Sequence, residues 1–189
     1  VVALREKLKP EFQKSYGLNP TYLIFVARAV VETLKDYPWI NGEIRGDKIV
    51  TRNYKNLGFA VELEDGKGLI VPVVKNAEGL NLLGMTRAVT DIADRARNKK
   101  LTPDEVQGGT FTITNPGSFG TLFGMPIINQ PQVAILAVGT IEKRVVVVDD
   151  MIAMRQRGYL TLGYDHRLVD GAVADEFMSK VKATLESWG

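Results

Sequence analysis

The sequence contains no cysteine, one histidine and no apolar run long enough to cross a membrane. Without cysteine the chain can form neither a disulfide nor a thiolate nucleophile, and it offers a metal no thiolate ligand. A single histidine also argues against a zinc site, which usually takes several nitrogen or sulfur ligands, and no metal is expected. A transmembrane helix needs about 20 apolar residues, so we expect no membrane partner.

The composition is typical of a globular domain with a sizeable core. The chain has 189 residues, of which 45% are hydrophobic and 24% charged, and its formal net charge is +2. No repeat, low-complexity stretch or linker interrupts it, so residues 1–189 are interpreted as one domain. The densest basic run, residues 95–100, ends a predicted helix, where cations complement the helix dipole. We therefore expect no nucleic-acid partner.

Hydrophobic periodicity predicts a mixed α/β layer. Apolar residues recur at helical spacing in residues 3–16, with a kink or break at Pro10, and in residues 20–36, 81–99 and 171–188. A hairpin is expected at Arg45-Gly46-Asp47 and a short helical turn at residues 102–106. Strands are predicted at residues 57–65, 68–75, 109–115, 132–139, 141–148 and 151–164.

The only histidine lies in "TLGYDHRLVDG", residues 161–171. The residues before it are β-branched and aromatic and predict a strand, whereas the pattern after Gly171 is helical. His166 is therefore placed where a strand passes into a helix, a position at which rigid scaffolds often carry functional side chains. A satisfied structural histidine is the other interpretation.

A second unusual stretch is "GGTFTITNPGSFGTLFGMPIINQPQVAIL", residues 108–136. Its threonines at 110, 112 and 114 alternate along a predicted strand and so share one face. The following Asn-Pro-Gly and further glycines predict a loop that is either mobile or closely packed. The stretch contains neither GxxxxGK[ST] nor GxGxxG, so a nucleotide phosphate loop is not expected.

Residues 166–171 fit the pattern HxxxDG, which occurs in chloramphenicol acetyltransferase, carnitine acyltransferases and peptide-synthetase condensation domains. A longer set of segments resembles the catalytic core of the dihydrolipoamide acyltransferases, the central component of 2-oxo acid dehydrogenase complexes. These segments are "ALREKLKPEF", "YPWINGEI", "GLIVPVVKNAEGL", "GGTFTITNPGSFG", "PIINQPQVAILAVG" and "LTLGYDHRLVDG", in that order. The resemblance covers nearly the whole chain and implies an α/β, chloramphenicol acetyltransferase-like fold, a mixed sheet flanked by helices.

The resemblance implies transfer of an acyl group between dihydrolipoamide and coenzyme A by direct thiol attack. His166 would be the general base, because the ordinary pKa of imidazole lies near the working pH. Thr114 aligns with the hydroxyl that the family directs toward the oxyanion; strand packing or a turn bond is the alternative. Asp170 would hold the site's geometry through an ion pair, with Arg167 a candidate partner, or would cap the last helix. The residues that contact coenzyme A are not identified.

The resemblance also implies partners outside this chain. Family members form trimers with the active site between subunits, and trimers build cubic or dodecahedral cores. Their lipoyl and subunit-binding domains precede the catalytic domain, so the chain is interpreted as an N-terminally truncated core whose lipoyl substrate is carried elsewhere. We expect a cytoplasmic location, or the mitochondrial matrix in a eukaryote.

The acyl group remains open among succinyl, acetyl and branched-chain. Thr114 and "PIINQPQ", residues 126–132, favour the succinyl branch of the family. Two other functions are kept as alternatives: a stand-alone small-molecule acetyltransferase of the same fold, and an assembly scaffold without activity. The match upstream of HxxxDG disfavours the first alternative, and the joint presence of His166, Thr114 and Asp170 disfavours the second.

Overall fold

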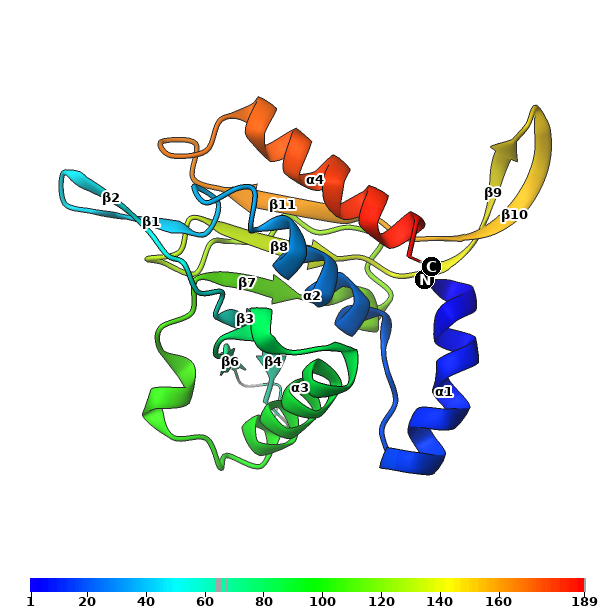
Figure 1. Cartoon of the computed structure of the whole chain (residues 1–189), viewed down its shortest axis with the longest axis horizontal. Coiled ribbons are helices and arrows are strands. Elements are labelled where there is room, and N and C mark those ends of the chain that lie inside the picture. The colour runs from blue at the N-terminus through cyan, green and yellow to red at the C-terminus, as the bar shows by residue number, and fades with distance from the viewer. Residues whose placement is uncertain (64–65, 67, 189) are drawn as a thin grey trace.

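The computed structural model describes residues 1–63, 66 and 68–188, and Figure 1 shows the arrangement of the chain. All four predicted helices form: α1 (Val2–Tyr16), α2 (Tyr22–Thr33), α3 (Leu82–Arg97) and α4 (Gly171–Glu186). Pro10 lies inside α1, which continues past it. The short 3-10 helices are η1 (Ala77–Gly79), η2 (Pro103–Val106) and η3 (Pro116–Phe119). Among the described residues, no helix is both long and apolar enough to cross a membrane.

The predicted hairpin forms from β1 (Gly42–Arg45) and β2 (Lys48–Thr51). The remaining strands are β3 (Leu57–Phe59), β4 (Val61–Glu62), β5 (Leu69–Ile70), β6 (Val73–Val74), β7 (Phe111–Thr114), β8 (Ala134–Val138), β9 (Glu142–Val148), β10 (Met151–Arg157) and β11 (Leu160–Tyr164). Every predicted strand region therefore contains at least one strand.

Three predicted strands are each divided in two, so the expectation of continuous strands at 57–65, 68–75 and 151–164 is wrong. Pro72 has no N–H to continue a ladder between β5 and β6, and its carbonyl accepts a bond from the Phe59 N–H at 2.9 Å. At Gly158 the chain leaves the β9–β10 ribbon and enters the central sheet as β11. Residues 64 and 65, at the end of the predicted strand 57–65, lie outside the described residues, as does residue 67 between that strand and the next.

The central sheet has five strands in the order β11-β8-β7-β3-β6. Strands β8, β7 and β3 run parallel, whereas β11 and β6 pair antiparallel at the two edges. This mixed sheet with flanking helices confirms the predicted fold class. In Figure 1, α2 and α4 lie side by side across one face of the sheet, and α3 lies next to the β3–β6 edge.

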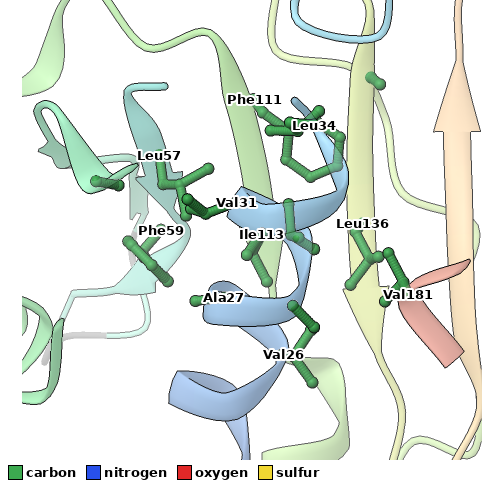
Figure 2. Packing of buried hydrophobic residues seen from close by; sticks show 14 of the residues in the cluster. Val26, Ala27, Val31, Leu34, Leu57, Phe59, Phe111, Ile113, Leu136 and Val181 are labelled. Carbon is green, nitrogen blue, oxygen red and sulfur yellow. The ribbon is translucent and has the colours of Figure 1, made fainter. Parts of the chain in front are cut away.

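The core lies between α2 and the sheet. Most of α2 is buried, which is why its sequence is apolar on nearly all sides rather than on one stripe. Figure 2 shows α2 side chains packed among strand residues and the α4 residue Val181; the labelled residues are Val26, Ala27, Val31, Leu34, Leu57, Phe59, Phe111, Ile113, Leu136 and Val181. This packing fixes the strands whose ends carry the candidate site.

Two apolar segments remain exposed in the single chain. The β9–β10 ribbon forms a sheet of its own and projects away from the body (Figure 1). Val145, Val147, Ile152 and Met154 are exposed on it, and Phe119, Phe123, Met125 and Ile127 are exposed on the segment between β7 and β8. An isolated two-stranded ribbon is marginally stable in water, and exposed apolar patches commonly mark contact surfaces.

Candidate active site

His166 lies in the turn that joins β11 to α4. The turn begins at Asp165, whose N–H donates to the Val133 carbonyl at 2.8 Å and so extends the β11–β8 pairing by one bond. The Asp165 carbonyl then accepts bonds from the N–H groups of Leu168 and Val169, each at 3.0 Å. The imidazole is exposed and packs against the Tyr164 ring, with 5.5 Å between ring centroids. His166 therefore points into solvent from a fixed turn.

Arg167 pairs with Asp165 across His166. Its guanidinium Nη2 lies 2.6 Å from Asp165 Oδ2, and its Nε lies 2.9 Å from Oδ1. The suggested Arg167–Asp170 pair is therefore wrong. The hydrogen bond from Arg167 holds the pKa of the Asp165 carboxyl below its usual range, although partial burial acts in the opposite direction. The same contact raises the pKa of Arg167.

Asp170 caps α4. Its Oδ1 accepts a bond from the Val173 N–H at 2.9 Å, which satisfies one of the free amides at the helix start. Capping was one of the two roles expected for Asp170. The carboxylate is exposed, and within the described part of the chain it forms no salt bridge, so the ion pair expected for Asp170 is not formed there.

Thr114 is the last residue of β7 and is half-buried. The hydroxyls of the two preceding threonines are engaged inside the fold: Thr112 Oγ1 donates to Gln132 Oε1 at 2.6 Å, and Thr110 Oγ1 accepts from the Asn56 N–H at 3.0 Å. The bend after Thr114 is closed by Ser118, whose hydroxyl donates to the Asn115 carbonyl at 2.8 Å. Among the described residues none bonds the Thr114 hydroxyl, and Thr114 is one of the residues that line a cleft of about 620 Å³.

The glycine-rich loop after Thr114 is closely packed at Gly117, whereas a Cβ on Gly120 would meet nothing within 4 Å. A Cβ on Gly117 would lie 2.3 Å from the Gly139 carbonyl carbon, and a Cβ on Gly139 would lie 2.0 Å from the Leu122 carbonyl oxygen. The loop therefore packs against the end of β8 through backbone contacts that no larger residue permits. Gly139 is a residue whose role the sequence pattern did not reveal.

A single chain keeps Thr114 and His166 apart. Thr114 lies opposite Ala137 in the pairing of β7 with β8, and Ala137 lies opposite Thr161 in the pairing of β8 with β11. Tyr164 is three residues further along β11, about 10 Å at 3.3 Å per residue, and His166 lies beyond it. Two strand spacings of about 4.8 Å add to this separation. In Figure 1 the turn after β11 and the end of β7 lie at opposite ends of the sheet.

The fold is that of chloramphenicol acetyltransferase. A structure of that enzyme matches 94% of this chain and 82% of its own, with a TM-score of 0.54 and 13% sequence identity, a likeness that concerns the fold alone. The family is shown by sequence. The sequence model of one protein family, the 2-oxoacid dehydrogenases acyltransferase (catalytic domain), matches residues 1–189, and the chain belongs to that family.

Curated relatives carry three different component names. The chain is 45% identical over 188 residues to the lipoamide acyltransferase component of a branched-chain alpha-keto acid dehydrogenase complex of Bacillus subtilis. It is 42% identical over 187 residues to a dihydrolipoyllysine-residue succinyltransferase component from Rickettsia bellii, and 47% over 193 to an acetyltransferase component from Mycobacterium tuberculosis. These matches cover 99%, 99% and 98% of this chain but 44%, 46% and 34% of the relatives, less than half of each.

Solved structures of the family superpose closely. The dihydrolipoamide acetyltransferase of Azotobacter vinelandii matches with a TM-score of 0.93 and 33% identity, over 98% of this chain and 76% of its own. The cubic core of a pyruvate dehydrogenase multienzyme complex matches with a TM-score of 0.93 and 34% identity, over 98% and 76%.

Proposed function

We propose that this domain transfers an acyl group between dihydrolipoamide and coenzyme A, with His166, Thr114 and Asp170 at its active site. One observation carries the assignment. The Azotobacter vinelandii structure comes from work on the roles of a serine, a histidine 52 positions later and an asparagine four positions further in that enzyme's catalytic mechanism. The same spacings separate Thr114, His166 and Asp170 here. Their order and chemistry agree, except that Asp170 is an acid where that enzyme has an amide.

The chemistry needs one base and one hydrogen-bond donor. In the forward direction the His166 imidazole takes the proton of the coenzyme A thiol, and the thiolate attacks the carbonyl carbon of the acyl-dihydrolipoamide thioester. The Thr114 hydroxyl donates to the oxygen that becomes negative in the tetrahedral intermediate. The bond to the lipoyl sulfur then breaks, and the imidazolium returns the proton to that sulfur. One thioester replaces another, so the reaction requires no ATP.

The site forms between two copies of the chain in this proposal. Thr114 and His166 lie at opposite ends of one sheet, too far apart to act on one carbonyl. A head-to-tail ring brings the His166 end of one copy against the Thr114 end of the next. The exposed apolar side chains of the β9–β10 ribbon and of residues 119–127 supply surface for such contacts. Trimers that build a larger core, cubic or dodecahedral, would follow the cubic core among the solved relatives.

The acyl group that we propose is succinyl, because of Thr114 and residues 126–132. Relatives of comparable identity are named for succinyl, acetyl and branched-chain complexes, so identity alone does not rank these groups. The lipoyl group would arrive on a separate lipoyl domain. We also propose a cytoplasmic location, in keeping with the bacterial sources of these relatives.

Transfer of acetyl, succinyl and isobutyryl groups from coenzyme A to dihydrolipoamide tests the proposal. We expect His166→Ala to lower turnover by about 10²–10⁴, the usual contribution of a general base, with assembly intact. Lys9→Ala, an exposed change on α1, is the control and should keep wild-type turnover. His166→Ala with more than half the wild-type turnover would refute the assignment. Transfer only to a small-molecule acceptor would favour the stand-alone enzyme, and no transfer at all the inactive scaffold.

A further inference from the structure

Asp165, the residue before His166, is the most heavily bonded residue of the turn. Its backbone N–H donates to the carbonyl of Val133, the residue before β8, and its carbonyl accepts bonds from the N–H groups of Leu168 and Val169. Its carboxylate Oδ1 also accepts the backbone N–H of Arg167 at 3.0 Å. This last contact is an Asx-turn, in which an Asp or Asn side chain bonds the backbone two residues on. The Asx-turn closes directly over His166.

The side-chain pair adds a second connection across the same residue. The Arg167 guanidinium contacts both carboxylate oxygens of Asp165 through Nε and Nη2, the bidentate arrangement with the most defined geometry. The Asp165 side chain is 17% exposed, whereas the Arg167 side chain is 70% exposed. Asp165 is therefore the more buried partner of this ion pair.

The imidazole is limited on another side by Tyr164. The two rings are tilted by 41° to each other, and a Cβ placed on Gly171 would lie 3.8 Å from the Tyr164 hydroxyl oxygen. Tyr164 therefore reaches from His166 to the first residue of α4. With Tyr164 packed against the ring and Asp165 closing the turn, the backbone direction of His166 and one face of its imidazole are both set.

We propose that Asp165 is a positioning residue for His166. The inference rests on the proposed function, because it requires that His166 be the base. Asp165 would act through His166 rather than on a substrate: its carboxylate closes the turn that carries the imidazole, and Arg167 bonds both oxygens of that carboxylate. A base displaced by about 1 Å can lose on the order of 10²-fold in rate. The role depends on the acceptor oxygen at Oδ1 more than on the negative charge.

Two substitutions separate the acceptor from the charge. Asp165→Asn keeps an oxygen for the Arg167 N–H and removes the charge, whereas Asp165→Ala removes both. We expect Asp165→Ala to lower kcat by about 10–100-fold, with KM for coenzyme A changed by less than about twofold. Asp165→Asn should recover kcat to within about threefold of wild type, because Asn closes Asx-turns as Asp does. Asp165→Ser offers a weaker hydroxyl acceptor and should fall between the two.

Both kinetic constants are measured on assembled protein, at one temperature that lies below the melting temperature of every variant. A residue that only stabilised the fold would leave kcat per assembled protein unchanged in all three variants. Asp165→Ala within twofold of wild-type kcat would overturn the inference. If Asp165→Ala does not fold, the test becomes the comparison of Asp165→Ser with Asp165→Asn. Equal kcat values for these two variants would overturn the inference. His166→Ala is assayed alongside: if it stays active, the proposed function fails; if it is inactive while Asp165→Ala is unaffected, only the present inference fails.

Discussion

Because Asp170 caps α4, we expect asparagine at this position to preserve most of the stability of the domain and alanine to lower it. Asp170→Ala removes the acceptor of the Val173 N–H at the start of α4. Loss of such a cap costs about 1 kcal/mol, within a range of about 0.5–2. In a domain of this size, that corresponds to a fall of about 2–4 °C in melting temperature. Asp170→Asn keeps the cap and loses only the attraction of an exposed charge to the helix dipole, about 0.3–1 kcal/mol, which Asp170→Ala loses in addition to the cap.

Urea and thermal unfolding of both variants measure these costs, at one fixed protein concentration because assembly contributes to stability. The turnover of Asp170→Asn should stay near that of the wild type, since its geometry survives. Removing the charge from a buried ion pair costs about 3–5 kcal/mol. A loss of that size in Asp170→Asn, or an equal loss in both variants, would refute the capping account and restore the ion pair expected from the sequence.

Two further predictions concern the other polar groups of the site. Thr114→Ala should lower turnover by about 10²–10³ with little change in KM for coenzyme A, and Thr114→Ser should be mild; a raised KM at unchanged turnover would mean that Thr114 binds substrate. Because the pKa of Asp165 is lowered by Arg167, its contribution to stability is present above the unfolded-state pKa near 4 and is lost as the pH falls through the folded-state value. Urea unfolding at pH 6 and pH 3 should therefore show a smaller acid-induced loss for Asp165→Asn than for the wild type, and equal losses would contradict this.

The fold was predictable where local pattern and tertiary structure agree. The 171–188 periodicity becomes α4, and the Thr102 cap with Pro103 becomes η2, closed by a bond between the Thr102 N–H and Glu105 Oε2 at 2.9 Å. Strand continuity failed at Pro72 and Gly158 because apolar runs do not reveal where a chain changes from one sheet to another. Hydrogen bonding, rather than hydrophobicity, decides those positions.

The candidate site was predictable in its residues and not in its contacts. The sequence pattern singled out His166, and the structure gives that residue a fixed turn and an exposed imidazole. Arg167 was one candidate partner for Asp170, and the sequence did not show which arginine would pair with it; in the structure Arg167 pairs instead with Asp165, two positions before it. The acid–histidine–arginine triplet was the available signal for this pair. The separation of Thr114 from His166 depends on strand register, which a single sequence does not specify.

Co-assembly of inactive variants tests most directly whether the active site is shared between copies. Thr114→Ala and His166→Ala chains are co-expressed in equal amounts, and mixed assemblies are verified by native mass spectrometry before transfer is assayed. In a head-to-tail ring, about a quarter of the interfaces pair an intact His166 with an intact Thr114, so about a quarter of wild-type activity should return. As a control, the Thr114→Ala/His166→Ala double variant is co-expressed in equal amounts with the wild type. A shared site should then leave about a quarter of wild-type activity, whereas a site within one chain would leave about half. Inactive mixed assemblies of the single variants, together with half activity in this control, would contradict the shared site.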